Sequence, residues 1–307
     1  MCIRDSTDTA KNRGGLIAFV SQKLTDYQLL VKFRLNLTVV FSSVMAYLIA
    51  SEGSIDWMAL SVLGLGGFLV TGAANALNQV LEKEYDQLMK RTENRPIAAG
   101  RMTISEGVMA AGFMSIFGIG LLASFNPWTA FLGTIALISY AFIYTPMKRV
   151  SPIAVLVGAI PGALPLMIGC VAVEGELTAL AIALFGIQFM WQFPHFWAIA
   201  WLGHEDYTNA GFNLLPSGVK DKNVGFQSAI YALMLIPIGM MPFLLGVTGI
   251  VSVVIVSIAA LIYAYAGWHL SKACTRAAAL KLMFSSCLLY TSPSPRDATL
   301  SRMPSSA

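Results

Sequence analysis

Residues 107–147 read GVMAAGFMSIFGIGLLASFNPWTAFLGTIALISYAFIYTPM, a stretch without a single charged side chain. A membrane-spanning helix requires about 20 predominantly apolar residues, so this stretch is long enough for two spans. Asn126-Pro127 lies near its middle, and an Asn-Pro pair typically ends one helix and begins the next. The stretch therefore predicts a hairpin of two transmembrane helices.

Further uncharged stretches extend this pattern along the chain. The last of them is divided at Val247-Thr248-Gly249, which gives eight predicted spans in all. A ninth begins near Ala277 but offers only about 14 suitable residues before Tyr290, too few to cross. The predicted fold is an all-α integral membrane bundle of eight to nine helices with a truncated ninth helix. The further stretches are 35–51, 57–81, 150–173, 177–203 and 224–268.

The composition agrees with lipid as the surrounding solvent. Hydrophobic residues make up 56% of the chain and charged residues 12%, against about 25% charged residues in soluble domains. The four cysteines lie far apart without a C-x-x-C pair, so the sequence gives no support to a zinc ribbon, a thioredoxin-type site or covalent haem attachment through C-x-x-C-H. We expect the lipid bilayer as a partner and no nucleic acid.

The basic residues predict the orientation. Every Lys and Arg falls before residue 35, within 81–106, at 148–149, at 220–222 or after 270, and the opposite connections contain none. Basic loops stay in the cytoplasm. We therefore predict a multi-pass protein of the bacterial cytoplasmic (inner) membrane, with its N-terminus and basic loops in the cytoplasm.

The two ends of the chain are set apart from the membrane domain at 35–287. Residues 1–34 form a predicted cytoplasmic or interfacial segment. The Ser- and Pro-rich residues 288–307 resemble translated adapter sequence, as do residues 1–6, so we interpret both as non-native. The natural ninth helix would then be cut near Cys287. A genuine disordered tail is the alternative.

The second span ends in a row of polar side chains. Asn78, Glu82 and Asp86 are spaced by four residues, which places them on one helix face. Stacked amide and carboxylate oxygens suit Mg²⁺ that keeps waters and bridges to a phosphate. A solvated helix end is the plain alternative.

Basic residues follow the carboxylates closely. Residues 90–96 read KRTENRP and contain Arg91, Asn94 and Arg95, and the fourth span ends Tyr144-Thr-Pro-Met-Lys148-Arg149. Arg forks and Lys ammonium groups hold phosphate oxygens. Acidic residues for a metal beside basic residues for oxygens predict a diphosphate site, although cytoplasmic topology alone also places basic residues here.

The sixth span carries a polar stripe formed by Gln188, Gln192 and His195 in an apolar helix. Polar residues within a span face the bundle interior and are functional candidates. For His195 the alternative is a packing role. That alternative is stronger for the aromatic residues Trp191 and Trp197, which are expected near membrane interfaces.

These motifs carry a family resemblance. N78-x₃-E82-x₃-D86 with R91-T-x-N94-R95-P96 resembles the first metal-binding signature of the UbiA-type membrane prenyltransferases. The segment at 191–197 (W-Q-F-P-H-F-W), with Glu205-Asp206-Tyr207, looks like the haem-farnesylating branch of that superfamily. The resemblance covers roughly residues 24–284 and includes Asp26-Tyr27 and Lys32-x-Arg34.

The resemblance implies a bundle around a central cavity and a transfer of the farnesyl group of farnesyl diphosphate to haem B, giving haem O. Asn78, Glu82 and Asp86 would hold Mg²⁺. The expected diphosphate ligands are Arg91, Asn94, Arg95, Tyr144, Lys148 and Arg149. The expected haem contacts are Trp191, Gln192, His195, Trp197, Glu205 and Asp206. Haem A synthase is a candidate partner.

Two departures from the superfamily pattern bear on the substrate. Glu82 stands where Asp is frequent, and it reaches further. The second Asp-rich motif of quinone-pathway relatives is replaced by His195 and Glu205-Asp206, which argues against a quinone head group. An aromatic or quinone-precursor prenyltransferase remains the alternative. A transporter is a weaker one, because the acidic residues lie at one membrane face rather than at the midplane.

Overall fold

Residues 20–51 and 53–287 are described by the structure, a computed structural model in which these residues form helices and no strands. The predictions for residues 1–6 and 288–307 lie outside the described residues. Of the predicted interfacial segment, residues 20–30 form a helix.

Within residues 20–51 and 53–287, eight helical stretches are long and apolar enough to cross a membrane, which confirms the predicted number and makes the chain a multi-pass membrane protein. The described part of the ninth helix, α14 (Arg276–Cys287), is 12 residues long. The spans are α2 (Phe33–Ala50), α3 (Trp57–Leu81), α5 (Ile104–Ala123), α6 (Pro127–Ile138) with η1 (Ser139–Tyr144) and α7 (Thr145–Met147), α8 (Ala154–Glu174), α9 (Ala179–Leu202), α11 (Lys222–Gly239) with α12 (Met241–Leu244), and α13 (Ile250–Ala273).

Local chemistry explains where the predicted hairpin turns. The Asn126 Oδ1 atom accepts a hydrogen bond from the Thr129 amide, and Pro127 occupies the first position of α6. Such a cap satisfies an amide that the helix leaves unpaired, and proline lacks the amide altogether. Asn126 Nδ2 also donates to the Val171 carbonyl of α8, so the turn is tied to its neighbour.

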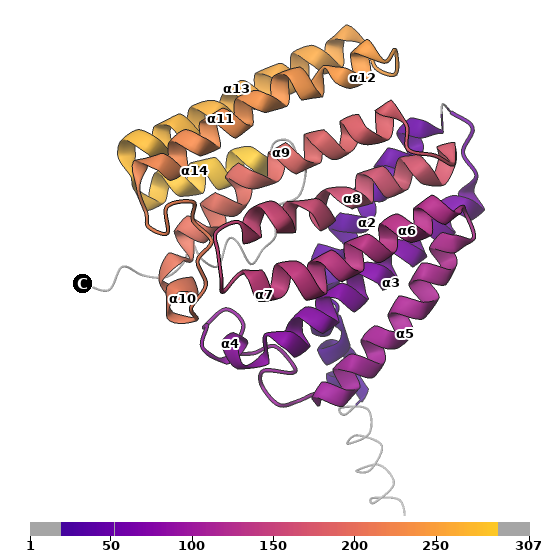
Figure 1. Cartoon of the computed structure of the whole chain (residues 1–307), viewed down its shortest axis with the longest axis vertical. Helices are drawn as coiled ribbons and strands as arrows, with labels where there is room; N and C mark the ends of the chain where they lie inside the picture. Colours follow the sequence, from indigo (N-terminus) through magenta and orange to yellow (C-terminus); the bar gives the residue numbers. More distant parts are fainter. Residues whose placement is uncertain (1–19, 52, 288–307) are drawn as a thin grey trace, which may run out of the picture.

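The spans pack into two groups of helices around two hydrophobic cores. Helices α2, α3, α5 and α6 with part of α8 surround one core, and α11, α13 and α14 pack against α9 around the other. Figure 1 shows α8 and α9 between the two groups, with the short helices α4 (Lys83–Gln87) and α10 (His204–Asn209) together at one end. That end also holds the basic connections.

Helices α11 and α13 approach each other at two glycines. A Cβ atom built on Gly225 would clash with the Ser271 amide nitrogen, and one on Gly267 would lie 2.7 Å from the Ala229 amide nitrogen. Small residues let membrane helices pack backbone against backbone, where van der Waals contact replaces the hydrophobic effect. These glycines therefore set the spacing of the pair.

The fourth span changes its winding before it ends. Its last part, η1, is a π-helix, and Pro146 follows in α7. Proline removes an amide donor from the helix. The Tyr140 carbonyl accepts both from the Thr145 amide and from the Thr145 hydroxyl, the latter at 2.9 Å. π-helical segments often occur at functional sites.

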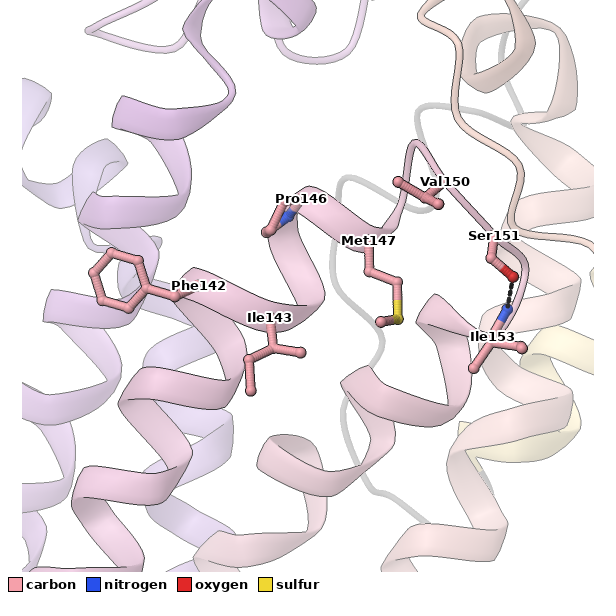
Figure 2. A pocket seen from close by; sticks show the side chains of 7 residues that line it. All are labelled: Phe142, Ile143, Pro146, Met147, Val150, Ser151 and Ile153. Atoms are coloured by element: carbon pink, nitrogen blue, oxygen red, sulfur yellow. Dashed lines mark hydrogen bonds between the residues drawn. The ribbon is translucent and has the colours of Figure 1, made fainter.

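The end of the fourth span and the connection to α8 border an apolar pocket of about 350 Å³. Figure 2 shows the side chains of Phe142, Ile143, Pro146, Met147, Val150, Ser151 and Ile153 around it. Phe142, Val150 and Ile153 are largely exposed, as expected for a surface that faces lipid. The central cavity implied by the family resemblance stays a prediction.

Candidate active site

Asn78, Glu82 and Asp86 meet where α3 gives way to α4. Glu82 departs from helical geometry, yet its amide still donates to the Asn78 carbonyl at 3.0 Å and the Asp86 amide donates to the Glu82 carbonyl at 2.8 Å. Asn78, Glu82 and Asp86 are therefore still spaced by one helical turn across the junction of α3 and α4, as predicted. All three side chains are at most 3% exposed, so they line a buried site rather than a solvated helix end.

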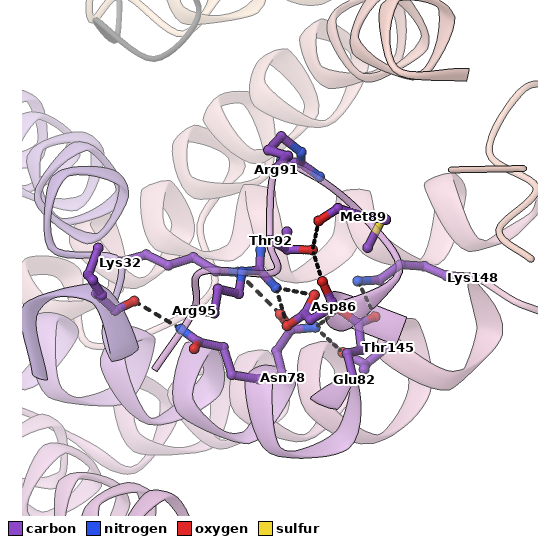
Figure 3. Close-up of polar contacts among 12 residues, drawn as sticks. Lys32, Asn78, Glu82, Asp86, Met89, Arg91, Thr92, Arg95, Thr145 and Lys148 are labelled. Atoms are coloured by element: carbon purple, nitrogen blue, oxygen red, sulfur yellow. Dashed lines mark hydrogen bonds and ion pairs between the residues drawn. The ribbon is translucent and has the colours of Figure 1, made fainter. Parts of the chain in front are cut away.

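Each of these three side chains has a basic partner. The Lys148 Nζ atom lies 2.6 Å from Glu82 Oε1, and Arg95 Nη1 lies 2.8 Å from each carboxylate oxygen of Asp86. Lys32 Nζ donates to Asn78 Oδ1 at 3.2 Å. Figure 3 shows these side chains converging from four segments of the chain. We call Lys32, Asn78, Glu82, Asp86, Arg95, Thr145 and Lys148 the polar cluster.

Two members of the cluster were not among the predicted site residues. Lys32 adopts a left-handed backbone conformation, with φ 50°, between the helix at 20–30 and α2, and this break turns its side chain toward Asn78. The Thr145 hydroxyl accepts a hydrogen bond from Asn78 Nδ2 at 3.1 Å. Only the folded chain brings these segments together. For Lys32, the sequence signal was the Lys32-x-Arg34 pair included in the family resemblance.

The charges in the cluster perturb one another. Burial, aided by the nearby Arg95 and Lys148 cations, holds the pKa of Lys32 well below its usual value. Burial also raises the pKa of Asp86, and the Arg95 guanidinium opposes this shift. Buried charges are costly unless they are paired, so each carboxylate here depends on its basic neighbour.

The remaining predicted diphosphate ligands lie at the edge of the cluster. Arg91 Nη2 donates to the Tyr207 hydroxyl at 2.9 Å, and Arg149 Nη1 donates to the Tyr85 hydroxyl at 2.7 Å. The Lys148 ammonium lies 4.6 Å from the centroid of the Tyr144 ring. The Asn94 side chain is exposed, and its carbonyl accepts from Arg101. Tyr85 and Tyr207 were not among the predicted site residues, although Tyr207 belongs to the Glu205-Asp206-Tyr207 motif.

The residues present fit a magnesium ion. No three His, Cys, Asp or Glu side chains come together among the described residues, so the protein offers two carboxylates and one amide. Mg²⁺ is commonly held by one or two carboxylates, substrate phosphates and waters. The enclosed Glu82 Oε1 atom has the Lys148 ammonium at 2.6 Å and no further hydrogen-bond donor among the described residues. A lone pair of this oxygen is therefore left for a metal.

The polar stripe on α9 lies apart from the cluster. Gln192 Nε2 donates to the Ala159 carbonyl of α8 and to the Gln188 carbonyl, while His195 Nδ1 lies 2.7 Å from the Ser286 hydroxyl of α14. His195 is seven residues before the end of α9 at Leu202, roughly 10 Å along the helix axis. The stripe thus extends from the basic end into the bundle.

The other predicted haem contacts have distinct surroundings. Trp197 is buried in the second hydrophobic core, and the Trp191 indole donates to the Ser286 carbonyl. Glu205 and Asp206 lie on α10, whose Tyr207 reaches the rim of the cluster through Arg91. For the two tryptophans the structure therefore shows packing and interhelical bonds, and contact with haem stays a prediction.

Known proteins match most of this chain in sequence. The model of the UbiA prenyltransferase family matches residues 39–288. A protoheme IX farnesyltransferase from Cytophaga hutchinsonii is 45% identical over 85% of this chain and 92% of its own length. One from Christiangramia forsetii is 42% identical over 87% of this chain and 90% of its own.

Solved structures match at the level of the fold. A digeranylgeranylglyceryl phosphate synthase structure has a TM-score of 0.74 at 19% identity and covers 87% of this chain and 94% of its own. A UbiA homolog from Archaeoglobus fulgidus, bound to DMAPP and Mg²⁺, has a TM-score of 0.66 at 13% identity. It covers 87% of this chain and all of its own.

Proposed function

The chain belongs to the UbiA prenyltransferase family, and we propose that it transfers the farnesyl group of farnesyl diphosphate to a vinyl group of haem B, giving haem O and diphosphate. The similarity to protoheme IX farnesyltransferases extends over most of the chain. The observation that carries the proposal is the polar cluster, where two buried carboxylates and an amide each contact a basic side chain.

We assign the metal and the leaving group to this cluster. Asn78, Glu82 and Asp86 would hold Mg²⁺, which when bound offsets the negative charge of the diphosphate. Arg95 and Lys148 already lie within 2.8 Å of the carboxylates, so they can contact phosphate oxygens bound at the same place. The rim residues Arg91 and Arg149 would bind the outer oxygens.

The reaction follows from where these charges lie. The allylic C–O bond of farnesyl diphosphate breaks, and the electron pair leaves with the diphosphate, which the basic residues stabilise. The farnesyl carbon becomes cationic, and a haem vinyl group attacks it to form the new C–C bond. Water adds to the resulting cation and loses a proton, which leaves a hydroxyethylfarnesyl substituent.

The acceptor is assigned to the inner part of α9. His195 would orient the porphyrin through its iron, since a neutral imidazole is a common ligand of iron. Gln192, Trp191, Trp197, Glu205 and Asp206 complete the proposed acceptor region. Aromatic rings on this helix would face the developing cation, which their negative faces stabilise.

We propose the cytoplasmic side of the bacterial inner membrane for the cluster. All basic connections lie at this end of the bundle, which supports that orientation. Haem A synthase is a candidate partner, and co-purification from solubilised membranes tests this part of the proposal separately.

The test is pigment analysis of membranes from haem-O-deficient bacteria that express the chain or its Asp86→Asn variant. Extracted haems are separated by chromatography and identified by mass. Haem O with the wild type and haem B alone with Asp86→Asn would support both the substrate and the metal site. Haem B alone with well-expressed wild-type protein would refute the haem assignment and favour an aromatic or quinone-precursor acceptor.

A further inference from the structure

Ser286 joins α9 to α14 at one point. It is buried, and its hydroxyl oxygen lies 2.7 Å from His195 Nδ1. Its carbonyl accepts a hydrogen bond from the Trp191 indole at 3.0 Å. The Trp191 ring stacks on the imidazole, with centroids 5.0 Å apart and planes 16° from parallel. The ring of His195 is thus held both at its edge and at its face.

The hydrogen bonds of Ser286 decide which nitrogen of His195 carries the proton. The hydroxyl donates its single hydrogen to the Met283 carbonyl at 2.5 Å, a bond that closes within α14. The oxygen can therefore only accept from His195, so Nδ1 carries the hydrogen. No acidic side chain forms an ion pair with His195 among the residues that the structure describes. We therefore treat the ring as neutral.

A neutral imidazole protonated at Nδ1 has its lone pair on Nε2. Nε2 has no hydrogen-bond partner among residues 20–51 and 53–287, and it is not one of their enclosed unpaired atoms. It is therefore free to bind a ligand. A hydrogen bond from Nδ1–H to oxygen also makes the opposite nitrogen a stronger donor to a metal.

We propose that Ser286 is a positioning residue, which fixes the Nδ1–H tautomer and the ring angle of His195 so that Nε2 binds the iron of the haem substrate. The inference rests on the proposed function. It adds that α14 takes part in acceptor binding, although Ser286 itself does not touch the haem.

The test titrates haem B into the purified full-length chain, with optical spectra for affinity and resonance Raman spectra of the ferrous complex for the iron–histidine stretch. His195→Ala should abolish that stretch. Ser286→Ala should weaken haem binding by about 10- to 100-fold, the usual effect of losing a hydrogen bond to a ligating histidine. It should also lower the frequency of the stretch. Ser286→Thr, which retains the hydroxyl, should restore both.

A matched control lies next in the chain. Ser285 is also buried and donates to the Leu282 carbonyl at 2.9 Å, so Ser285→Ala should leave the stretch unchanged. Magnesium-dependent binding of farnesyl diphosphate should persist in all these variants, which shows that they fold.

The outcomes separate the two claims. Suppose that the wild-type protein makes haem O. If the iron–histidine stretch then survives in His195→Ala, or keeps its wild-type frequency in Ser286→Ala, the role of Ser286 is refuted and the proposed function stands. If wild-type protein neither binds haem nor makes haem O, both are refuted.

Discussion

Both carboxylate oxygens of Asp86 lie 2.8 Å from one nitrogen, Nη1, of Arg95. The proposed metal ligand and the proposed diphosphate ligand are therefore in direct contact before any substrate binds. Lys148 and Glu82 form a second such pair at 2.6 Å. In each pair a partly exposed cation offsets the charge of a buried carboxylate, which would be costly without a partner. We therefore expect the proposed metal and the diphosphate to bind together at these pairs.

Replacement of Glu82 tests the metal site with a matched control. Glu82→Gln keeps the volume of the side chain but removes its charge, and we expect magnesium-dependent turnover to fall by on the order of 100-fold. Glu84 is exposed and lies two residues away, so Glu84→Gln should stay within about twofold of the wild type. Steady-state rates at several Mg²⁺ concentrations check this. Equal rates for the two variants would contradict the metal assignment.

Replacement of Lys148 tests whether this residue binds the diphosphate. Lys148→Met keeps the apolar stem and removes the ammonium group that contacts Glu82. We expect the affinity for inorganic diphosphate in the presence of Mg²⁺ to fall by roughly 10- to 100-fold, because a charge-assisted contact is lost. Calorimetric titration measures it. Lys220 is exposed, so Lys220→Met is the control and should bind diphosphate as the wild type does. Equal affinities for diphosphate in Lys148→Met and Lys220→Met would contradict the assignment.

Two ion pairs of unequal exposure join the helix at residues 20–30 to the segment at residues 101–106. Arg101 Nε lies 2.8 Å from Asp26 Oδ1, and Asp26 is only 1% exposed. Arg101→Ala leaves a buried carboxylate without its partner, so we expect a loss of about 1–3 kcal/mol in the free energy of unfolding.

The pair between Lys23 and Glu106 is more exposed, so Lys23→Ala should lower the free energy of unfolding by less than Arg101→Ala does. Unfolding in detergent–denaturant mixtures measures both losses. A larger effect at Lys23 than at Arg101 would overturn this ranking.

The close packing of α11 on α13 allows the effect of a substitution on stability to be predicted. A methyl group on Gly225 would meet the backbone of Ser271, which cannot move aside as a side chain can. Gly225→Ala should therefore destabilise the protein by about 1–3 kcal/mol. Gly112 of α5 has nothing within 4 Å of a built Cβ, so Gly112→Ala should be neutral or slightly stabilising. The melting temperatures in detergent should fall for the first variant only.

The sequence predicted the spans because charges are excluded from lipid. The stretch at 107–147 and its break at Asn126-Pro127 appear in the structure as α5 and the α6–α7 segment. The spacing of Asn78, Glu82 and Asp86 likewise predicted that these side chains lie together, and they do.

What the sequence could not predict depends on contacts between distant segments. Thr145 follows the π-helix of the fourth span and accepts a hydrogen bond from Asn78, which lies 67 residues earlier in the chain. Lys32 joins because the chain turns through a left-handed conformation before α2. The bond between His195 and Ser286 spans 91 residues. No local pattern encodes such contacts, since they arise from the packing of the helices.

The most direct test of the central claim incubates the purified protein with haem B, farnesyl diphosphate and Mg²⁺ in water enriched in ¹⁸O. We predict a product whose mass equals haem B plus one farnesyl group and one hydroxyl, with ¹⁸O in the new hydroxyl and no product when Mg²⁺ is chelated. Recovery of unchanged haem B, from protein that prenylates an aromatic acid under the same conditions, would contradict the account.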